Sequence, residues 1–294
     1  EDGRMDVAGV STAGAGLTLL STDDVTLDGS VTVVGDTSIV AGTTSGGIAV
    51  NAKLNGSGTI LLDAADEITI DASIDPTTVT LNADDDITVN SAVVASELIT
   101  ISAGEDGSGS FILGATGSLE TSDSGSDITV TTGASNGDIT LTGTTTALDQ
   151  VTMTSASGSI NGSGLVTSGT VDLNASSGIG NTTGVALSSS NITADTTTGD
   201  IEIANNLGTA VSVLSLTTGT GSVSIDQSGG GDLSTSVVSA SGAVTLANAA
   251  GSLSLAGTLT GNSLDATASG AITDDSDGDL AIADLAEFTA GSLE

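Results

Sequence analysis

The sequence predicts an all-β protein built as a parallel β-helix, or β-solenoid, of about 13 coils of roughly 20 residues each. The first observation behind this prediction is a short motif in which two apolar residues flank one small polar residue. Such period-2 alternation in β-branched residues is typical of a half-buried strand. The motif occurs at residues 17–19, 25–27, 68–70, 79–81, 87–89, 139–141, 223–225, 244–246 and 253–255.

The second observation is that these short strands return on a longer period. Triads that begin at Ile60, Val79 and Ile99 follow one another at nearly equal steps of about 20 residues. Two further series with similar steps interleave along the chain, one at Val151, Val171, Ile192 and Leu214, the other at Ile160, Ile179, Ile201, Val223, Val244 and Leu264. Interleaved series that share one period predict a single solenoid domain over residues 1–294.

The third observation is an apolar content of 37% that is almost free of aromatic residues, with Phe111 and Phe288 as the two exceptions. Val, Ile, Leu and Ala suit a narrow interior of stacked, similar side chains. A pair of immunoglobulin-like sandwiches would instead favour longer strands, an aromatic core and more proline than Pro76 alone. Regular alternation and a positive mean hydropathy argue against disorder, and coils of varying length fit a strict six-residue left-handed helix less well.

Each triad is expected to point its outer two residues inward and its central residue outward. In residues 139–141 this places Ile139 and Leu141 inside and Thr140 outside. Gly, Asn and Asp between triads supply tight turns, and successive coils then pair in parallel, with right-handed winding preferred. The region 103–127 is the least regular, and we expect a longer outward loop there.

The net charge of −35 comes from 37 acidic residues against Arg4 and Lys53 alone. Nucleic acid and anionic membranes are therefore excluded as favoured partners, because binding phosphate needs Lys and Arg. Cations, polycationic partners or a high-salt setting are favoured instead. The chain has no Cys, no apolar run of the length of a membrane span and no signal peptide at residues 1–4, so an exported protein would be a mature chain or an excised fragment.

Several phrases resemble the repeats of filamentous-haemagglutinin-type adhesins and related giant bacterial surface proteins. The phrases are Gly137-Asp138-Ile139-Thr140-Leu141, Gly199-Asp200-Ile201-Glu202-Ile203, Ser269-Gly270-Ala271-Ile272-Thr273-Asp274 and Phe288-Thr289-Ala290-Gly291-Ser292-Leu293. The resemblance covers nearly the whole chain. It implies a right-handed β-helical shaft, export across the outer membrane and adhesion, and it carries no catalytic residues over to this chain.

The residue inventory predicts that the protein is not an enzyme. The chain has no His to assist a nucleophilic Ser. A β-helical polysaccharide lyase would need a poised basic residue, whereas Arg4 lies near the terminus and Lys53 is isolated. Paired carboxylates can run a glycosidase, but a sugar site would normally add Trp or Tyr platforms.

Calcium is the predicted metal, because oxygen-only ligands suit it. The candidate ligands are the alternating carboxylates of Asp274, Asp275, Asp277 and Asp279, although the loop lacks the Gly and the closing Glu of an EF-hand. Asp84-Asp85-Asp86 and the run Gly229-Gly230-Gly231-Asp232-Leu233 are weaker candidates.

Outward positions beside the triads could also bind cations. They read Glu67-Thr69-Asp71 and, one period further on, Asp86-Thr88-Asn90, so that Glu67 is expected to stack near Asp86 and Asp71 near Asn90. Asp127-Thr129-Thr131 and Asp138-Thr140-Thr142 repeat the pattern. The alternative is a solvated acidic face that keeps the surface soluble and blocks edge pairing.

The sequence therefore predicts an extracellular or cell-surface protein, a structural and adhesive β-helical shaft of an adhesin or filament. Its partners would be a longer parent chain or other copies, joined end to end near residues 17–20 and 280–293, and a glycan or surface receptor. The alternatives are a self-assembling extracellular fibre or matrix subunit and, next, a carbohydrate-active β-helix.

Overall fold

The computed structural model describes residues 3–12, 14, 16–181, 184–274 and 279–293. Over these residues the chain contains strands and turns without helix, and its parallel coils form a β-solenoid of about 13 turns, about 21 residues apart. The predicted fold class is thereby confirmed. The chain divides into two compact units, unit 1 (Glu1–Ser157) and unit 2 (Gly158–Glu294).

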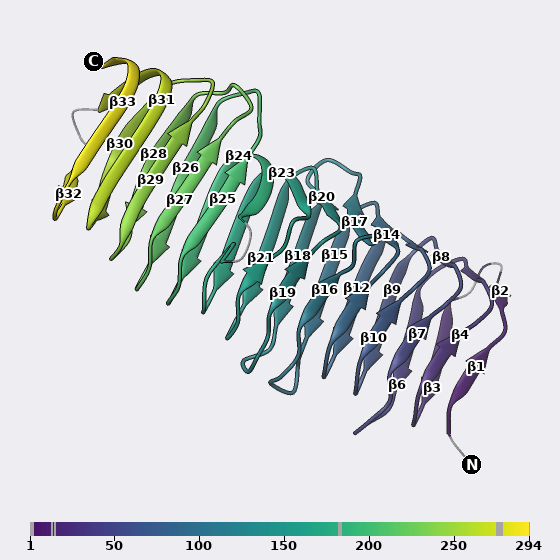
Figure 1. Ribbon diagram of the computed structural model, residues 1–294. Helices are drawn as coiled ribbons and strands as arrows, with labels where there is room; N and C mark the ends of the chain where they lie inside the picture. The colour runs from purple at the N-terminus through teal and green to yellow at the C-terminus, as the bar shows by residue number, and fades with distance from the viewer. Residues whose placement is uncertain (1–2, 13, 15, 182–183, 275–278, 294) are drawn as a thin grey trace. The chain divides into compact units, whose positions relative to one another are not determined.

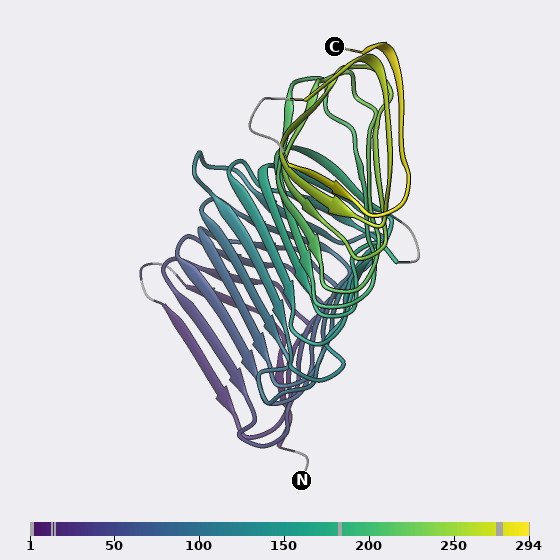
Figure 2. The same ribbon diagram turned by 90° about the vertical axis from the view of Figure 1, so that its left-hand side faces the viewer.

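In unit 1 each coil contributes one short strand to each of three parallel sheets (Figures 1 and 2). The first sheet holds β1 (Met5–Val7), β4 (Val25–Leu27), β7 (Ile48–Val50), β10 (Ile68–Ile70), β13 (Ile87–Val89), β16 (Phe111–Leu113) and β19 (Ile139–Leu141). The second holds β2 (Val10–Thr12), β5 (Val31–Val33), β8 (Leu54–Gly56), β11 (Ile74–Asp75), β14 (Ala92–Ala95), β17 (Ser118–Thr121) and β20 (Thr144–Thr146). The third holds β3 (Leu17–Ser21), β6 (Thr37–Ala41), β9 (Thr59–Ala64), β12 (Thr78–Ala83), β15 (Leu98–Ala103), β18 (Asp127–Thr132) and β21 (Gln150–Ser155).

In unit 2 several strands are longer, because one strand runs through positions that two strands fill in a coil of unit 1 (Figure 1). Register shifts add residues that face no partner to β26 (Val211–Thr218), β30 (Leu253–Gly261) and β31 (Ser263–Asp274). The strands are β22 (Ile160–Asn161), β23 (Leu165–Ala175), β24 (Val185–Thr196), β25 (Ile201–Asn205), β26 (Val211–Thr218), β27 (Val223–Gln227), β28 (Leu233–Ser239), β29 (Ala243–Asn248), β30 (Leu253–Gly261), β31 (Ser263–Asp274), β32 (Leu280–Ile282) and β33 (Ala286–Leu293).

The strand pairings reproduce the predicted period. Val79 pairs with both Ile60 and Ile99 in the third sheet of unit 1. In unit 2 each member of the series predicted from sequence pairs with the next: Ile160, Ile179, Ile201, Val223, Val244 and Leu264. The residues that repeat in the sequence are therefore the ones that stack in space.

The predicted series Val151, Val171, Ile192 and Leu214 is wrong at its last member. Ile192 pairs with Val213, and Thr193 pairs with Ser215, so Leu214 faces no partner in β24. The extra residue forms a bulge that turns the Leu214 side chain outward, leaving it 45% exposed. The triad that begins at Leu214 therefore does not continue the inward column.

The core of each unit consists of stacked aliphatic columns. Ile139 and Leu141 are buried, as predicted, and Thr140 between them is half-buried on the outer side. Phe111 pairs with Ile87 on one side and Ile139 on the other, and it is fully buried. One aromatic ring thus lies in a column that otherwise holds Met5 at its end and β-branched residues from Val25 to Ile139.

Turns between strands are tight where successive coils touch. A Cβ on Gly29 would lie 1.6 Å from the backbone oxygen of Ala8, so only glycine fits the predicted Asp28-Gly29-Ser30 turn.

The region 103–127, predicted to be the least regular, belongs to an unusually long coil, because Ile99 pairs with Ile128, well beyond the end of an ordinary coil. Its extra residues lie in turns that include 104–110, which stacks on loop 133–138 through a bridge between Ser108 and Ser135.

Buried amide side chains form a polar column inside unit 2. Asn205, Gln227 and Asn248 pair in register at the ends of β25, β27 and β29, and all are fully buried. Asn205 Nδ2 donates to Gln227 Oε1 at 2.7 Å, and Asn248 Nδ2 donates to the backbone oxygens of Gly231 and Ser252 at 3.0 and 2.8 Å. The hydrogen bonds offset the desolvation that burial imposes on the amides.

The inward register can be tested by two neighbouring substitutions. Ile139→Asp is expected to destabilise unit 1 by several kcal/mol or more, because it buries an unpaired carboxylate in the apolar column. Thr140→Asp should change stability by no more than about 0.5 kcal/mol, because its side chain reaches water. Thermal melts of the two variants provide the comparison. Equal losses in both would contradict the assigned register.

Candidate functional site

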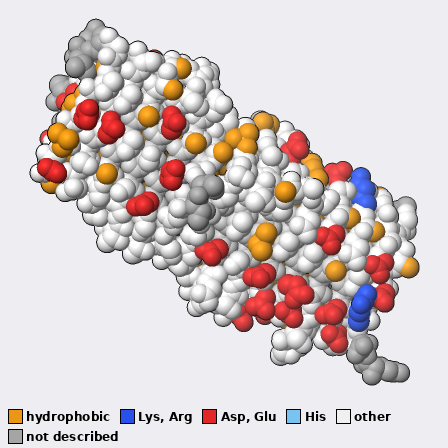
Figure 3. Space-filling model, viewed as in Figure 1, with side chains coloured by type: hydrophobic (Ala, Val, Ile, Leu, Met, Phe, Trp, Pro, Cys, Tyr) orange, Lys and Arg blue, Asp and Glu red, His pale blue; other side chains and the backbone are white. Residues whose placement is uncertain are grey.

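The strongest concentration of chemical groups is an acidic surface on unit 1, at the turns that lead from the third sheet into the first. Acidic side chains gather on the visible face of this unit (Figure 3). Asp66-Glu67 precedes β10 and Asp85-Asp86 precedes β13, so the pairing of Ile68 with Ile87 sets the two pairs side by side. The Asp85 N–H donates to the Asp66 backbone oxygen at 3.4 Å, and the Ile68 N–H donates to the Asp86 oxygen at 3.0 Å.

This surface is hollowed into an open groove of about 500 Å³, bounded on one side by the stacked loops 104–110 and 133–138. Carboxylates, hydroxyls and one amide line it, which gives the groove many acceptors and no cation among its lining residues. The lining residues are Glu67, Thr69, Asp85, Asp86, Thr88, Ser108, Gly109, Ser110 and Asn136.

Burial and the crowding of carboxyl groups together raise two pKa values here. Partial burial raises the pKa of Asp66, and the adjacent Glu67 raises it further. A hydrogen bond with Asp66 raises the pKa of Asp85, with burial and the charge on Asp66 adding to the effect. A raised pKa makes protonation of these two carboxyl groups easier, and protonation would relieve part of the repulsion on this surface.

Other aspartates use their carboxylates to hold the backbone of the next coil. Asp86 Oδ1 accepts a hydrogen bond from the Ser110 N–H at 2.7 Å, and Asp24 Oδ1 accepts from the Gly47 N–H at 3.0 Å. The same contact recurs in unit 1 between Asp36 and Thr59 (2.9 Å), and in unit 2 between Asp200 and Ser222 (2.7 Å) and between Asp232 and Ser252 (2.8 Å). Charge-assisted hydrogen bonds of this kind join coil to coil.

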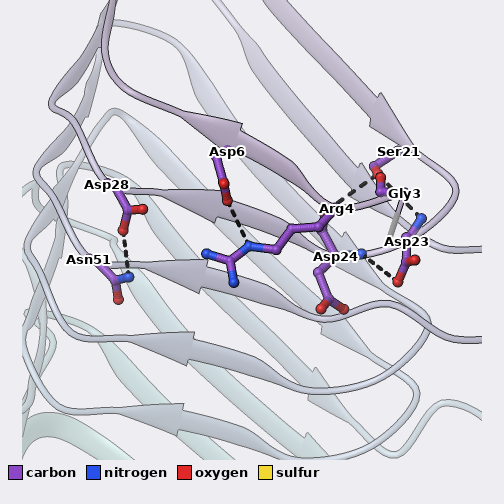
Figure 4. Close-up of polar contacts among 8 residues, drawn as sticks. All are labelled: Gly3, Arg4, Asp6, Ser21, Asp23, Asp24, Asp28 and Asn51. Carbon is purple, nitrogen blue, oxygen red and sulfur yellow. Dashed lines mark hydrogen bonds and ion pairs between the residues drawn. The ribbon is translucent and has the colours of Figure 1, made fainter. Parts of the chain in front are cut away.

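The predicted outward stacking is confirmed for Asp71 and Asn90. Asn90 Nδ2 donates to Asp71 Oδ1 at 2.9 Å, and the same arrangement joins Asn51 to Asp28 at 2.9 Å (Figure 4). Glu67 and Asp86 lie in register, as expected. The other two segments with this pattern lie on different sheets, residues 127–131 on the third and residues 138–142 along the first.

The predicted calcium loop is described in part. Asp275 and Asp277 lie outside the described residues. Asp274 ends β31 and Asp279 precedes β32, and both are exposed. The weaker candidate Asp232 binds the Ser252 backbone instead. Within the described ranges, no group of three or more acidic residues is arranged to hold a metal ion.

The two basic residues lie apart from the acidic groove. Arg4 Nε contacts Asp6 Oδ1 at 2.6 Å, with both side chains largely exposed (Figure 4). This contact raises the pKa of Arg4. Lys53 is exposed, and its backbone oxygen accepts the Val31 N–H at 2.8 Å. In the described part of the chain, no helix is long and apolar enough to cross a membrane.

Sequence reasoning missed the buried amide column. The signal was present, because Asn205, Gln227 and Asn248 each follow a predicted inward residue by four positions and recur with the period of that series. The repeat was overlooked because such amide residues are normally expected at turns and not in a buried column.

The raised pKa values of Asp66 and Asp85 predict that acidification stabilises unit 1. A carboxyl group whose folded pKa is raised contributes stability that is fully present below its unfolded pKa, about 3.9, and is lost as the pH rises through the folded value. Urea denaturation should give a higher midpoint near pH ~4 than near pH ~7, and Asp85→Asn should reduce the difference by at most about 1 kcal/mol, since solvent screens these groups.

The control for this pH experiment is Asp226→Asn, which removes an exposed carboxylate of unit 2. It should leave the pH dependence of unit 1 as in the parent chain. A parent midpoint that rises with pH over this range would contradict the assignment.

The calcium site predicted from the sequence would give CaCl2 an effect on the melting temperature that ionic strength alone does not reproduce. Millimolar CaCl2 should raise the melting temperature more than NaCl at matched ionic strength, because a divalent ion bridges carboxylates that a monovalent ion only screens. Asp274→Asn combined with Asp279→Asn should reduce the difference. Identical effects of the two salts would remove loop 274–279 from consideration as a metal site.

Comparisons of the chain with protein-family models, with curated proteins and with solved structures found no match in any of the three.

Proposed function

We propose that this chain is a non-enzymatic structural segment, a β-helical shaft of an extracellular surface adhesin or filament. The observation that carries the proposal is the coil-to-coil register within each unit, where parallel pairing joins successive coils through short, chemically similar strands. A protein of this design carries load and holds distance without needing a reactive centre.

Backbone hydrogen bonds supply the mechanical resistance. In unit 1 each coil is bonded to its neighbours through three sheets, so opening one coil requires the loss of several bonds together. The buried aliphatic columns add an apolar contact that the same opening would expose to water. These features support a role in which resistance to force and to proteases is the selected property.

The outer surface supports the adhesive part of the proposal. Thr80, Thr100, Thr129 and Thr152 occupy equivalent outward positions on successive coils of the third sheet. A repeated display of hydroxyl groups favours weak, multivalent contact with a glycan or surface receptor. The resemblance of the repeats to filamentous-haemagglutinin-type adhesins points to the same setting, the cell surface.

A second candidate function is that of a self-assembling extracellular fibre subunit. The observation that favours it lies in the last coil of unit 2, where Leu280 is 45%, Leu285 60% and Phe288 37% exposed. Leu255, Leu259 and Ile272 line an apolar cavity of about 200 Å³ together with Leu280 and Phe288. End-to-end contact between this coil and residues near 17–20 of another copy would cover these side chains.

Electron microscopy of the purified chain, with limited proteolysis, distinguishes the two candidates. A shaft segment is expected to appear as isolated particles of one chain that resist protease within strands. A fibre subunit would form long unbranched polymers, and the double variant Leu280→Asp with Leu285→Asp should prevent their formation. The control variant Leu214→Asp changes another exposed leucine of unit 2 and should leave the polymers intact. Rapid cleavage throughout the strands would contradict both.

A further inference from the structure

Three Asn-Gly pairs occur in the chain, at Asn55-Gly56, Asn136-Gly137 and Asn161-Gly162. In such a pair the backbone nitrogen of Gly can attack the side-chain carbonyl carbon of Asn, because glycine has no Cβ to obstruct the approach. The structure places the three pairs in different environments, which differ in how easily the Gly nitrogen can reach the Asn side chain.

Two of the pairs are restrained by the sheets. Asn55 and Gly56 both lie in β8, where they pair in register with Thr32 and Val33. Asn161 lies in β22, its Nδ2 donates to Ser159 Oγ at 2.6 Å, and its Oδ1 is buried. The approach of nitrogen to carbonyl carbon at either pair would require strand residues to leave their places.

Asn136 is different because it is exposed in loop 133–138 and lies outside any strand, whereas Gly137 beside it is buried. Its φ of +55° makes it the one non-glycine residue with a left-handed backbone among those described. Its side chain lines the acidic groove, where water has access. Both the reacting amide and the water that must complete the reaction are therefore available.

Hydroxyl groups restrain Gly137, whose backbone nitrogen is the attacking atom. The Gly137 N–H donates to Ser157 Oγ at 3.1 Å, and the Gly137 oxygen accepts hydrogen bonds from the hydroxyls of Thr132 and Ser155. The nitrogen must leave Ser157 before it can attack. The hydrogen bond to Ser157 is therefore one that the reaction has to break.

We propose that Asn136-Gly137 is a site of spontaneous deamidation. The Gly137 nitrogen loses its proton and forms a bond to Cγ of Asn136, the Cγ–Nδ2 bond breaks, and the amide nitrogen departs as ammonia. Water then opens the resulting cyclic imide at either carbonyl, which yields aspartate or isoaspartate at position 136. Every step is a substitution or hydrolysis, so no oxidant or reductant is required.

The product changes the loop in two ways. A new carboxylate joins the groove that Asp85 and Asp86 already line, and the isoaspartate form lengthens the backbone by one carbon. Either change acts on the bond from Ser110 Oγ to the Asn136 oxygen (3.0 Å), which ties the loop to the preceding coil. Loosening should remain local, because coils of a solenoid depend mainly on their neighbours.

Peptide mapping by mass spectrometry tests the proposal directly. The full chain is incubated at mildly alkaline pH, either folded or unfolded in guanidinium, and the deamidated fraction of each pair is followed over time. Unfolded, the three pairs should react at similar rates. Folded, Asn136 should react about tenfold faster than Asn55 or Asn161, since the latter need local opening of the sheet. Equal protection of all three, or faster reaction at Asn55 or Asn161, would overturn the proposal.

Ser157→Ala tests the control of the rate. It should speed the reaction at Asn136 about fivefold, the factor that corresponds to one ordinary hydrogen bond, while Ser124→Ala, an exposed serine of unit 1, should not. An unchanged rate in Ser157→Ala would refute the role of Ser157. General unfolding would be distinguishable, because all three pairs would then accelerate together.

Discussion

Parallel pairing between successive coils is the constraint on which the rest of each unit depends. Because a residue pairs with its equivalent one coil away, every side chain must tolerate a near copy of itself as a neighbour. Aliphatic residues of similar size satisfy this condition in the columns around Ile68 and Ile87. Phe111 shows that one larger ring is accepted where its neighbours are Ile87 and Ile139.

The same constraint has an electrostatic cost, since it stacks like charges as readily as like hydrocarbons. A chain with a net charge of −35 must reduce this repulsion locally. Asp86 and Asp200 do so by accepting backbone N–H groups of the next coil, and Asp71 does so by facing Asn90. Asp66 and Asp85 instead crowd one another: burial and the adjacent Glu67 raise the pKa of Asp66, and a hydrogen bond with Asp66 together with burial raises the pKa of Asp85. The acidic surface is thus partly a structural element of the solenoid.

The sequence predicted the fold well, because period and alternation are properties of the chain that the coil preserves. The series from Ile160 to Leu264 needed no correction. The prediction for Leu214 was wrong because a bulge adds a residue to the strand without changing the local apolar pattern. The roles of the carboxylates were harder to predict, since Asp232 looks alike in sequence whether it binds a cation or the Ser252 backbone. Only the position of the next coil distinguishes these cases.

Coil length varies far more than strand register. Ile60 pairs with Val79 across an ordinary coil and Ile99 pairs with Ile128 across a much longer one, yet both close into the same sheet. Additional residues enter at the turns, where they extend into solvent and leave the paired strands in place. The turns are therefore natural acceptors for inserted peptides, and lineages of such a protein could diversify their surface by lengthening corners while inheriting an unchanged scaffold.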